Sequence, residues 1–156
     1  DLSGLKEGFR DPISMIHDVN AAFDPDKAYK DSKLCNVMTT LALSRRLKQK
    51  QSKITVNCFN PGLVPTTGLF RNFNLVFTTL FTLATKYIFK VGIGEEEAGQ
   101  RLAYMITSPD LDGVSGQYYS GRPGKSEYFQ VQPSLEAQNI EKQELLWQYT
   151  ENLIKA

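Results

Sequence analysis

The chain has 156 residues, of which 41% are hydrophobic and 22% charged, and its formal net charge is +1. This length indicates one domain at most, with enough apolar material for a core. The near-zero net charge removes any electrostatic case for binding nucleic acid, and one histidine with two cysteines cannot form a usual zinc site. We therefore expect neither a metal nor a nucleic-acid partner.

Two cysteines fall within regular patterns, Cys35 in a helical one and Cys58 in a strand-like one. We interpret both as buried structural thiols in a reducing, intracellular compartment. No stretch reaches the ~18 apolar residues that a membrane span needs, and no targeting segment is visible. Since the chain opens with Asp-Leu-Ser-Gly, we interpret it as the later part of a longer soluble protein.

Residues 1–23 lack sustained periodicity and are predicted to be loop with at most one helical turn, and a long helix is predicted to start at Asp24-Pro25. Its predicted core positions keep helical spacing: Leu34, Val37, Met38, Leu41 and Leu47. Basic residues crowd its end: Arg45, Arg46, Lys48 and Lys50. Cations suit the dipole there, so a solvated helix end is favoured over a patch for a partner.

The predicted helix also carries Tyr29 and Lys33, four residues apart and therefore on one face. A phenol is ordinarily too weak an acid to exchange protons at neutral pH, but a nearby ammonium group favours the phenolate. The two residues could therefore form a proton-transfer pair. Many solvated helix faces carry the same spacing, so the pair by itself is weak evidence.

A strand is predicted over residues 54–59, where a largely β-branched, uncharged run is typical of a buried parallel strand. It leads into Asn60-Pro61-Gly62-Leu63-Val64-Pro65-Thr66. In open α/β sheets, ligands bind outside the carboxyl ends of strands, and glycine lets the backbone approach a ligand closely. This turn is therefore a candidate ligand site, although a plain strand-to-helix turn has the same composition.

Residues 69–89 form the most aromatic stretch, and Phe73, Phe77, Leu80, Phe81 and Ala84 can share a helical face. From the residues alone, a core helix is the default interpretation of this stretch, and an interfacial membrane contact through residues 72–91 is the alternative.

The remaining elements are a helix over 95–107, a strand over 114–119 and a final helix capped by Ser134. The helix over 95–107 is predicted to bury Ala98, Leu102, Met105 and Ile106. The final helix is predicted to have an apolar side made of Ile140, Leu146, Trp147, Leu153 and Ile154, with Trp147 as a core anchor. Alternating helices and strands predict an α/β fold.

The order of three features resembles the second half of a member of the short-chain dehydrogenase/reductase family: a helix with Tyr-x-x-x-Lys, then a strand, then Pro-Gly-x-Val-x-Thr. Residues 12–16, 28–36, 66–71, 95–99 and the tail 134–154 are similar to the light-dependent protochlorophyllide oxidoreductases of that family. The resemblance covers nearly the whole chain. It implies that residues 1–156 are the C-terminal half of one domain with a Rossmann-type, doubly wound parallel sheet and flanking helices. The Gly-rich dinucleotide fingerprint of the N-terminal half is missing, so the fragment alone is expected to be inactive.

The resemblance further implies NADPH as cofactor, with Tyr29 as the proton donor and Lys33 on the nicotinamide ribose. The turn at Pro61 and Gly62, the backbone of Val64 and the hydroxyl of Thr66 are expected to hold the nicotinamide. An apolar substrate, a tetrapyrrole, is expected against a wall of Leu63, Phe70, Phe73 and Phe77. The resemblance also implies that the stretch 69–89 borders the substrate pocket. A lid over a flat apolar substrate therefore becomes its first interpretation, with the core helix close behind and the membrane contact third. The implied location is a plastid, or the cytoplasm or thylakoid surface of a cyanobacterium.

One position departs from the resemblance. These oxidoreductases usually have Tyr-Pro-Gly-Cys in the turn, whereas this chain has Asn60-Pro61-Gly62-Leu63. Leucine can neither donate a proton nor act as a thiol. The alternatives are therefore a related short-chain reductase acting in the dark on a carbonyl or a retinoid-like lipid, and a truncated interaction module without activity.

Overall fold

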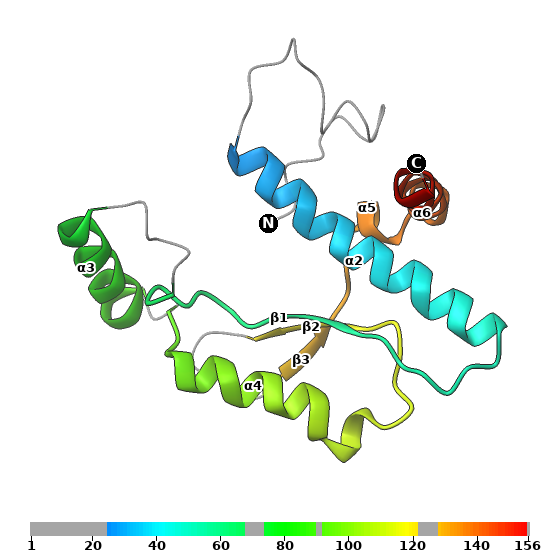
Figure 1. The fold of residues 1–156 in the computed structure, drawn as a ribbon. Helices are drawn as coiled ribbons and strands as arrows, with labels where there is room; N and C mark the ends of the chain where they lie inside the picture. Colours follow the sequence, from blue (N-terminus) through cyan, green and yellow to red (C-terminus); the bar gives the residue numbers. More distant parts are fainter. Residues whose placement is uncertain (1–24, 68–73, 90–91, 122–127, 156) are drawn as a thin grey trace, which may run out of the picture. The chain divides into compact units, whose positions relative to one another are not determined.

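A computed structural model describes residues 25–67, 74–89, 92–121 and 128–155 (Figure 1). The chain divides into two compact units. Unit 1 comprises residues 1–58, 115–117 and 132–156, and unit 2 comprises residues 59–114 and 118–131. Each unit is described by itself. The predicted loop 1–23 and the predicted start of the first helix at Asp24 lie outside the described residues.

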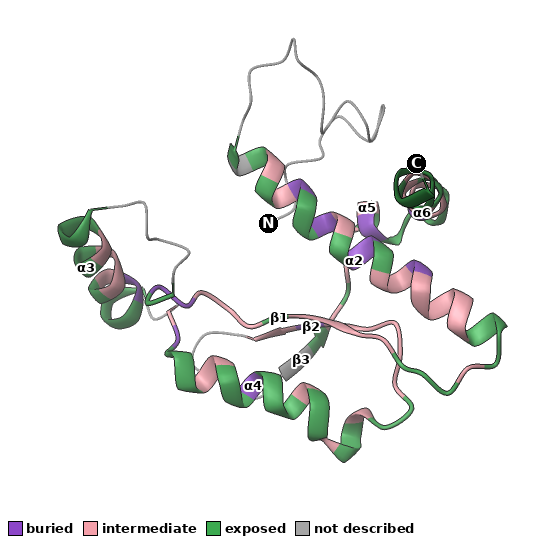
Figure 2. Ribbon diagram, viewed as in Figure 1, coloured by how far each residue is buried: buried purple, intermediate pink, exposed green. Residues whose placement is uncertain are grey.

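Unit 1 is built on helix α2, Pro25–Gln49, against which α5, Leu135–Gln138, and α6, Ile140–Lys155, pack. One face of α2 is buried (Figure 2), and Leu34, Val37 and Met38 lie on it as predicted. Ala42 is fully buried as well, whereas Leu41 and Leu47 are half-buried. This apolar stripe fixes the rotation of α2, so the residues on its other face point to solvent.

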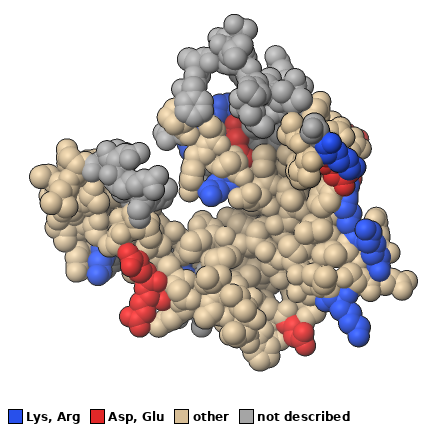
Figure 3. All heavy atoms as spheres, viewed as in Figure 1, with Lys and Arg blue, Asp and Glu red and all other residues tan. Residues whose placement is uncertain are grey.

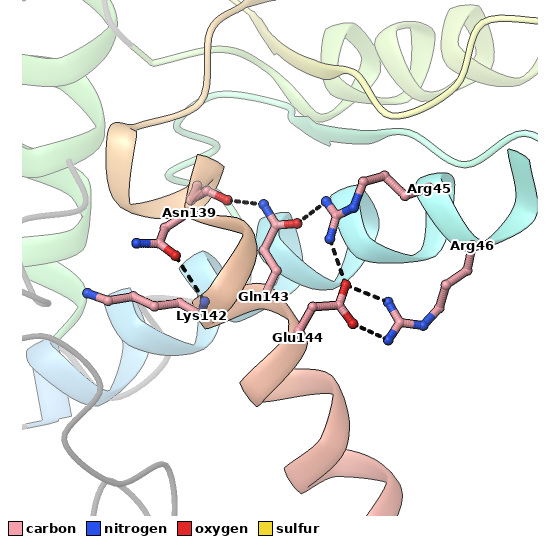
Figure 4. A network of polar contacts seen from close by, with 7 residues as sticks. Arg45, Arg46, Asn139, Lys142, Gln143 and Glu144 are labelled. Atoms are coloured by element: carbon pink, nitrogen blue, oxygen red, sulfur yellow. Dashed lines mark hydrogen bonds and ion pairs between the residues drawn. The ribbon is translucent and has the colours of Figure 1, made fainter. Parts of the chain in front are cut away.

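Polar contacts join the C-terminal part of α2 to α6 (Figure 4). Arg45 and Arg46 both donate to the Glu144 carboxylate, at 2.9 Å and 3.0 Å respectively. Arg45 also donates to Gln143, a buried side chain whose Nε2 donates to the Ala137 carbonyl at 2.6 Å. The prediction of a solvated basic helix end is therefore wrong for Arg45 and Arg46, since a carboxylate from a distant helix binds both.

The C-terminal segment differs from the predicted single helix. Ser134 caps it as predicted, and its side chain accepts a hydrogen bond from Ala137 N. The helix is interrupted at Asn139, however. The Asn139 Oδ1 accepts from Lys142 N at 3.0 Å and caps the start of α6. The predicted apolar side is mostly wrong: Ile140, Leu153 and Ile154 are exposed, and Leu146 and Trp147 are half-buried. The indole of Trp147 lies under the Arg46 guanidinium at 4.2 Å, so it supports the α2–α6 contact instead of a core.

Unit 2 contains most of a three-stranded sheet in the order β1, Cys58–Asn60, β2, Tyr118–Gly121, and β3, Tyr128–Val131. β2 and β3 are antiparallel, with Tyr118 opposite Val131 and Gly121 opposite Tyr128. The mixed α/β class is as predicted, and the sheet is compatible with part of a Rossmann-like fold. β3 was not predicted.

The strand predicted over 54–59 is reduced to β1, and side-chain bonds explain the loss. Val56 N donates to Ser115 Oγ at 3.0 Å, and Gln117 N donates to Asn57 Oδ1 at 3.0 Å. Because side-chain oxygens take the place of backbone carbonyls, the regular ladder starts only at Cys58, whose N donates to the Gln117 carbonyl at 3.0 Å.

The aromatic segment forms α3, Leu75–Leu83, continued by the π-helix η3, Ala84–Ile88. Asn74 caps it, its Oδ1 accepting from Phe77 N at 2.7 Å. α3 buries none of its residues, so the core-helix interpretation is wrong for it, and its surface is largely uncharged (Figure 3). Within the described residues, no helix is both long enough and apolar enough to span a bilayer.

Helix α4, Glu95–Thr107, has the predicted bounds, and a 3-10 turn, Pro109–Leu111, follows it. Its predicted inward face is wrong for Leu102, which is 45% exposed, and for Ile106, which is 73% exposed. Its buried residue is Arg101, which is 2% exposed.

Candidate functional site

The structure brings Tyr29 and Lys33 together on the outer face of α2. The Lys33 Nζ lies 5.0 Å from the centroid of the Tyr29 ring, a cation–π contact. Tyr29 is 51% exposed, so its phenol is accessible to a ligand. The geometry follows from helical spacing, and the burial of Leu34 and Met38 on the opposite face orients both side chains outward. A positive charge thus lies one turn from an accessible phenol.

The neighbouring Asp31 points the other way. Its side chain is buried and pairs with Lys27, whose Nζ lies 2.7 Å from Oδ2. Asp31 is therefore held on the inner side of the helix, apart from the outward phenol and ammonium group. On this part of α2, the exposed candidates for proton transfer are therefore Tyr29 and Lys33.

The turn after β1 is built around Gly62, whose φ of +103° suits glycine. Gly62 N donates to Asn60 Oδ1 at 3.0 Å, and the Pro61 carbonyl accepts from Arg101 Nη1 at 2.7 Å. The next residue, Leu63, forms an isolated parallel bridge with Gly92. The Pro-Gly turn is therefore fixed on both sides.

Beyond Leu63, the chain turns again. Val64 is buried, and its carbonyl accepts from Thr67 N at 3.3 Å and Thr67 Oγ1 at 2.9 Å. Thr66 is exposed. The turn thus holds Val64 inward and presents the predicted cofactor residue Thr66 outward.

Arg101 is the residue of this region that sequence reasoning missed. Its guanidinium also binds Glu97, with Nη2 2.6 Å from Oε1. The i, i+4 spacing of Glu97 and Arg101 is visible in the sequence, but it is the common spacing of exposed helix pairs, so it does not predict a buried charge.

Of the predicted substrate wall, Leu63 is half-buried and Phe77 is 44% exposed. Phe77 stacks on Phe81, with ring centroids 5.8 Å apart. Phe70 and Phe73 lie outside the described residues. The Tyr29–Lys33 pair belongs to unit 1 and the 61–66 turn to unit 2.

The two cysteines, both within the part of the chain that the structure describes, are half-buried and form no disulfide. Burial raises the pKa of Cys35, and the charge of Asp31 raises it further. Burial is also the main cause of the raised pKa of Cys58. Both favour the neutral thiol, so neither is suited to act as a nucleophile. Among the described residues, no cluster of His, Cys, Asp or Glu could hold a metal ion.

In class, the chain is a mixed α/β protein whose Tyr-Lys helix precedes a Pro-Gly turn at the end of a strand. Over 154 residues, 99% of the chain, it is 40% identical to chloroplastic protochlorophyllide reductase of Daucus carota and to protochlorophyllide reductase A of Arabidopsis thaliana. Over 152 residues it is 40% identical to the protochlorophyllide reductase of Marchantia paleacea. No family model matches the chain.

The chain spans 38% of the carrot relative and 32% of the Marchantia relative. It resembles the C-terminal half of these reductases.

Proposed function

We propose that this chain is the C-terminal part of one short-chain reductase domain, whose complete form has a doubly wound parallel sheet and reduces protochlorophyllide with NADPH. The observation that carries the proposal is the Lys33 ammonium group above the ring of an accessible Tyr29. The names of the relatives support the substrate, and the word chloroplastic in those names supports a plastid location. A cyanobacterial cytoplasm or thylakoid surface remains the alternative location.

Tyr29 donates a proton to the substrate in this proposal. Donation leaves a phenolate, which a cation one turn away stabilises. Lys33 also binds the nicotinamide ribose, for which its exposed ammonium has three donors. A well-placed general acid of this kind contributes roughly 10²–10⁴-fold to the rate.

The residues of the turn fit a bound nicotinamide. Gly62 presents backbone without a side chain, and Thr66 presents a hydroxyl outward. We assign the nicotinamide carboxamide to the backbone of Val64 and the hydroxyl of Thr66, with Pro61 and Gly62 shaping the turn. NADPH, when bound, supplies the hydride.

We assign a wall of the substrate pocket to Leu63, Phe70, Phe73 and Phe77, which suits an apolar tetrapyrrole. The exposed apolar surface of α3 supports this role, because a lid has to present such a surface to its ligand. As an alternative to the lid, we propose that residues 72–91 make a peripheral membrane contact through this apolar surface.

Leu63 favours a second candidate, a related reductase that acts in the dark on a carbonyl or a retinoid-like lipid. An apolar side chain at this position supplies wall area but no proton, so every proton must come from Tyr29 or water. A truncated interaction module is the third candidate.

The test is to illuminate the full-length protein with NADPH and protochlorophyllide and to follow chlorophyllide fluorescence. We expect product in the light and none in the dark. No product in the light, together with dark NADPH oxidation by an aldehyde or ketone, would establish the second candidate. If the protein did not bind NADPH, both enzyme candidates would be excluded and the interaction module would be the candidate that is left.

A further inference from the structure

Arg101 carries a charge in a place where charges are rarely found. It lies on α4, within unit 2, and is 2% exposed. An ionised group buried to this degree is costly unless hydrogen bonds and an opposite charge compensate it. Glu97 supplies the charge at 2.6 Å, and the Pro61 carbonyl supplies a bond at 2.7 Å.

Backbone geometry leaves room for the guanidinium. A Cβ at Gly62 would lie 3.2 Å from Nη1, and a Cβ at Gly121 of β2 would overlap the guanidinium. Gly62 and Gly121, from segments far apart in the sequence, therefore both lie beside the Arg101 guanidinium. We call Arg101, Glu97, Gly62 and Gly121 the arginine cradle.

The Pro61–Gly62 peptide is bound at both of its polar atoms. Its carbonyl accepts from Arg101, and its N–H, on the opposite side of a trans peptide, donates to Asn60 Oδ1. With both atoms bound, the plane of this peptide cannot rotate without losing a hydrogen bond. The direction in which the chain leaves Gly62 toward Val64 and Thr66 depends on that plane.

We propose that Arg101 is a positioning residue, which holds the 60–67 turn in the conformation that receives the nicotinamide. The inference rests on the proposed function for the identity of the ligand. Arginine suits the role because its planar fork binds the Pro61 carbonyl and Glu97 at once, whereas the compact ammonium of lysine cannot reproduce that geometry. Glu97 orients the fork from the neighbouring turn of α4.

The test compares Arg101→Lys with Arg46→Lys in the full-length protein. Arg46 is the matched control, because it also pairs with a glutamate, Glu144, but belongs to unit 1, whereas the turn belongs to unit 2. Two readouts are taken: amide hydrogen exchange of residues 60–67, and the KM for NADPH against kcat.

We expect Arg101→Lys to speed exchange in the turn about tenfold, as for the loss of one charge-assisted hydrogen bond, and to raise the KM for NADPH more than it lowers kcat. Arg46→Lys should change neither readout. If Arg101→Lys does not fold, Glu97→Gln should give the same changes, because it keeps a hydrogen-bond acceptor beside the guanidinium but removes the charge that compensates it.

Unchanged exchange and unchanged KM in folded Arg101→Lys or Glu97→Gln would overturn the inference, as would equal effects from Arg46→Lys. If the wild-type protein did not bind NADPH, the proposed function would fail, and the exchange comparison would still decide whether Arg101 holds the turn.

Discussion

Replacing Gly62 by alanine perturbs the 60–67 turn in two separable ways. The φ of +103° costs an L-residue about 1–2 kcal/mol. The new Cβ would also lie 3.2 Å from Arg101 Nη1 and 3.5 Å from Ile93 Cδ1. Displacing the guanidinium weakens a charged hydrogen bond to Pro61, worth about 1.5–3 kcal/mol. We therefore expect Gly62→Ala to lower the free energy of unfolding by about 3 kcal/mol.

Gly113→Ala is the matched control. Gly113 also has a positive φ, +71°, but a Cβ there would meet no atom within 4 Å. It should cost about 1 kcal/mol, from backbone strain alone. Urea denaturation of the two full-length variants measures the difference, and NADPH titration should show weaker binding for Gly62→Ala only. Equal losses of stability, with equal NADPH affinity, would refute the cradle as the source of the extra cost.

Three further variants test other parts of the proposal. If protochlorophyllide is the substrate, Leu63→Cys should leave light-driven turnover unchanged or raise it. If Leu63 lines the pocket of another substrate, the variant should weaken the binding of that substrate by about 1 kcal/mol or less. Lys33→Arg keeps the charge but not the compact ammonium, so NADPH affinity and activity should fall; a change in melting temperature alone would make Lys33 an ordinary surface residue. Hydrogen bonds from Arg46 and Arg45 lower the pKa of Glu144 below its ordinary value of 4.5. Glu144 therefore stabilises the fold above pH 4.5, and this contribution disappears as the pH falls through the lowered pKa. Because 37% of its side chain is exposed, screening limits the contribution to about 0.5–1 kcal/mol. The stability difference between wild type and Glu144→Gln should thus be present at neutral pH and vanish in acid; a difference that persists in acid would contradict the charge argument.

The candidate catalytic pair could be predicted because it depends on local geometry alone. Tyr29 and Lys33 lie within one helix, and the helical spacing that places them on one face needs no knowledge of the rest of the fold. The bounds of α4 were predictable for the same reason, since Glu95 opens the helix and Ser108-Pro109 ends it.

The faces of the helices could not be predicted with the same success, because distant residues determine them. Apolar spacing favoured Leu102 and Ile106 as the buried side of α4, but the Pro61 carbonyl and the glycines of two other segments receive Arg101 instead. Similarly, α6 meets α2 through Gln143 and Glu144, which no apolar pattern would select.

Strands were the least predictable elements. β3 pairs with β2 across a Gly- and Pro-containing connection, and pairing of this kind depends on the partner strand more than on local propensity. The strand predicted from residue 54 was shortened by Ser115 and Asn57, whose side chains compete for backbone N–H groups. Such competition is decided by tertiary contacts.

The most direct test of the central claim, that Tyr29 donates the proton, is the turnover of full-length Tyr29→Phe under illumination with NADPH and protochlorophyllide. The variant keeps the ring on which Lys33 lies and removes only an exposed hydroxyl, so the free energy of unfolding should change by no more than about 0.5 kcal/mol. We expect turnover to fall by roughly 10²–10⁴-fold while NADPH affinity stays near the wild-type value. Near-normal turnover in a folded, NADPH-binding variant would contradict the claim.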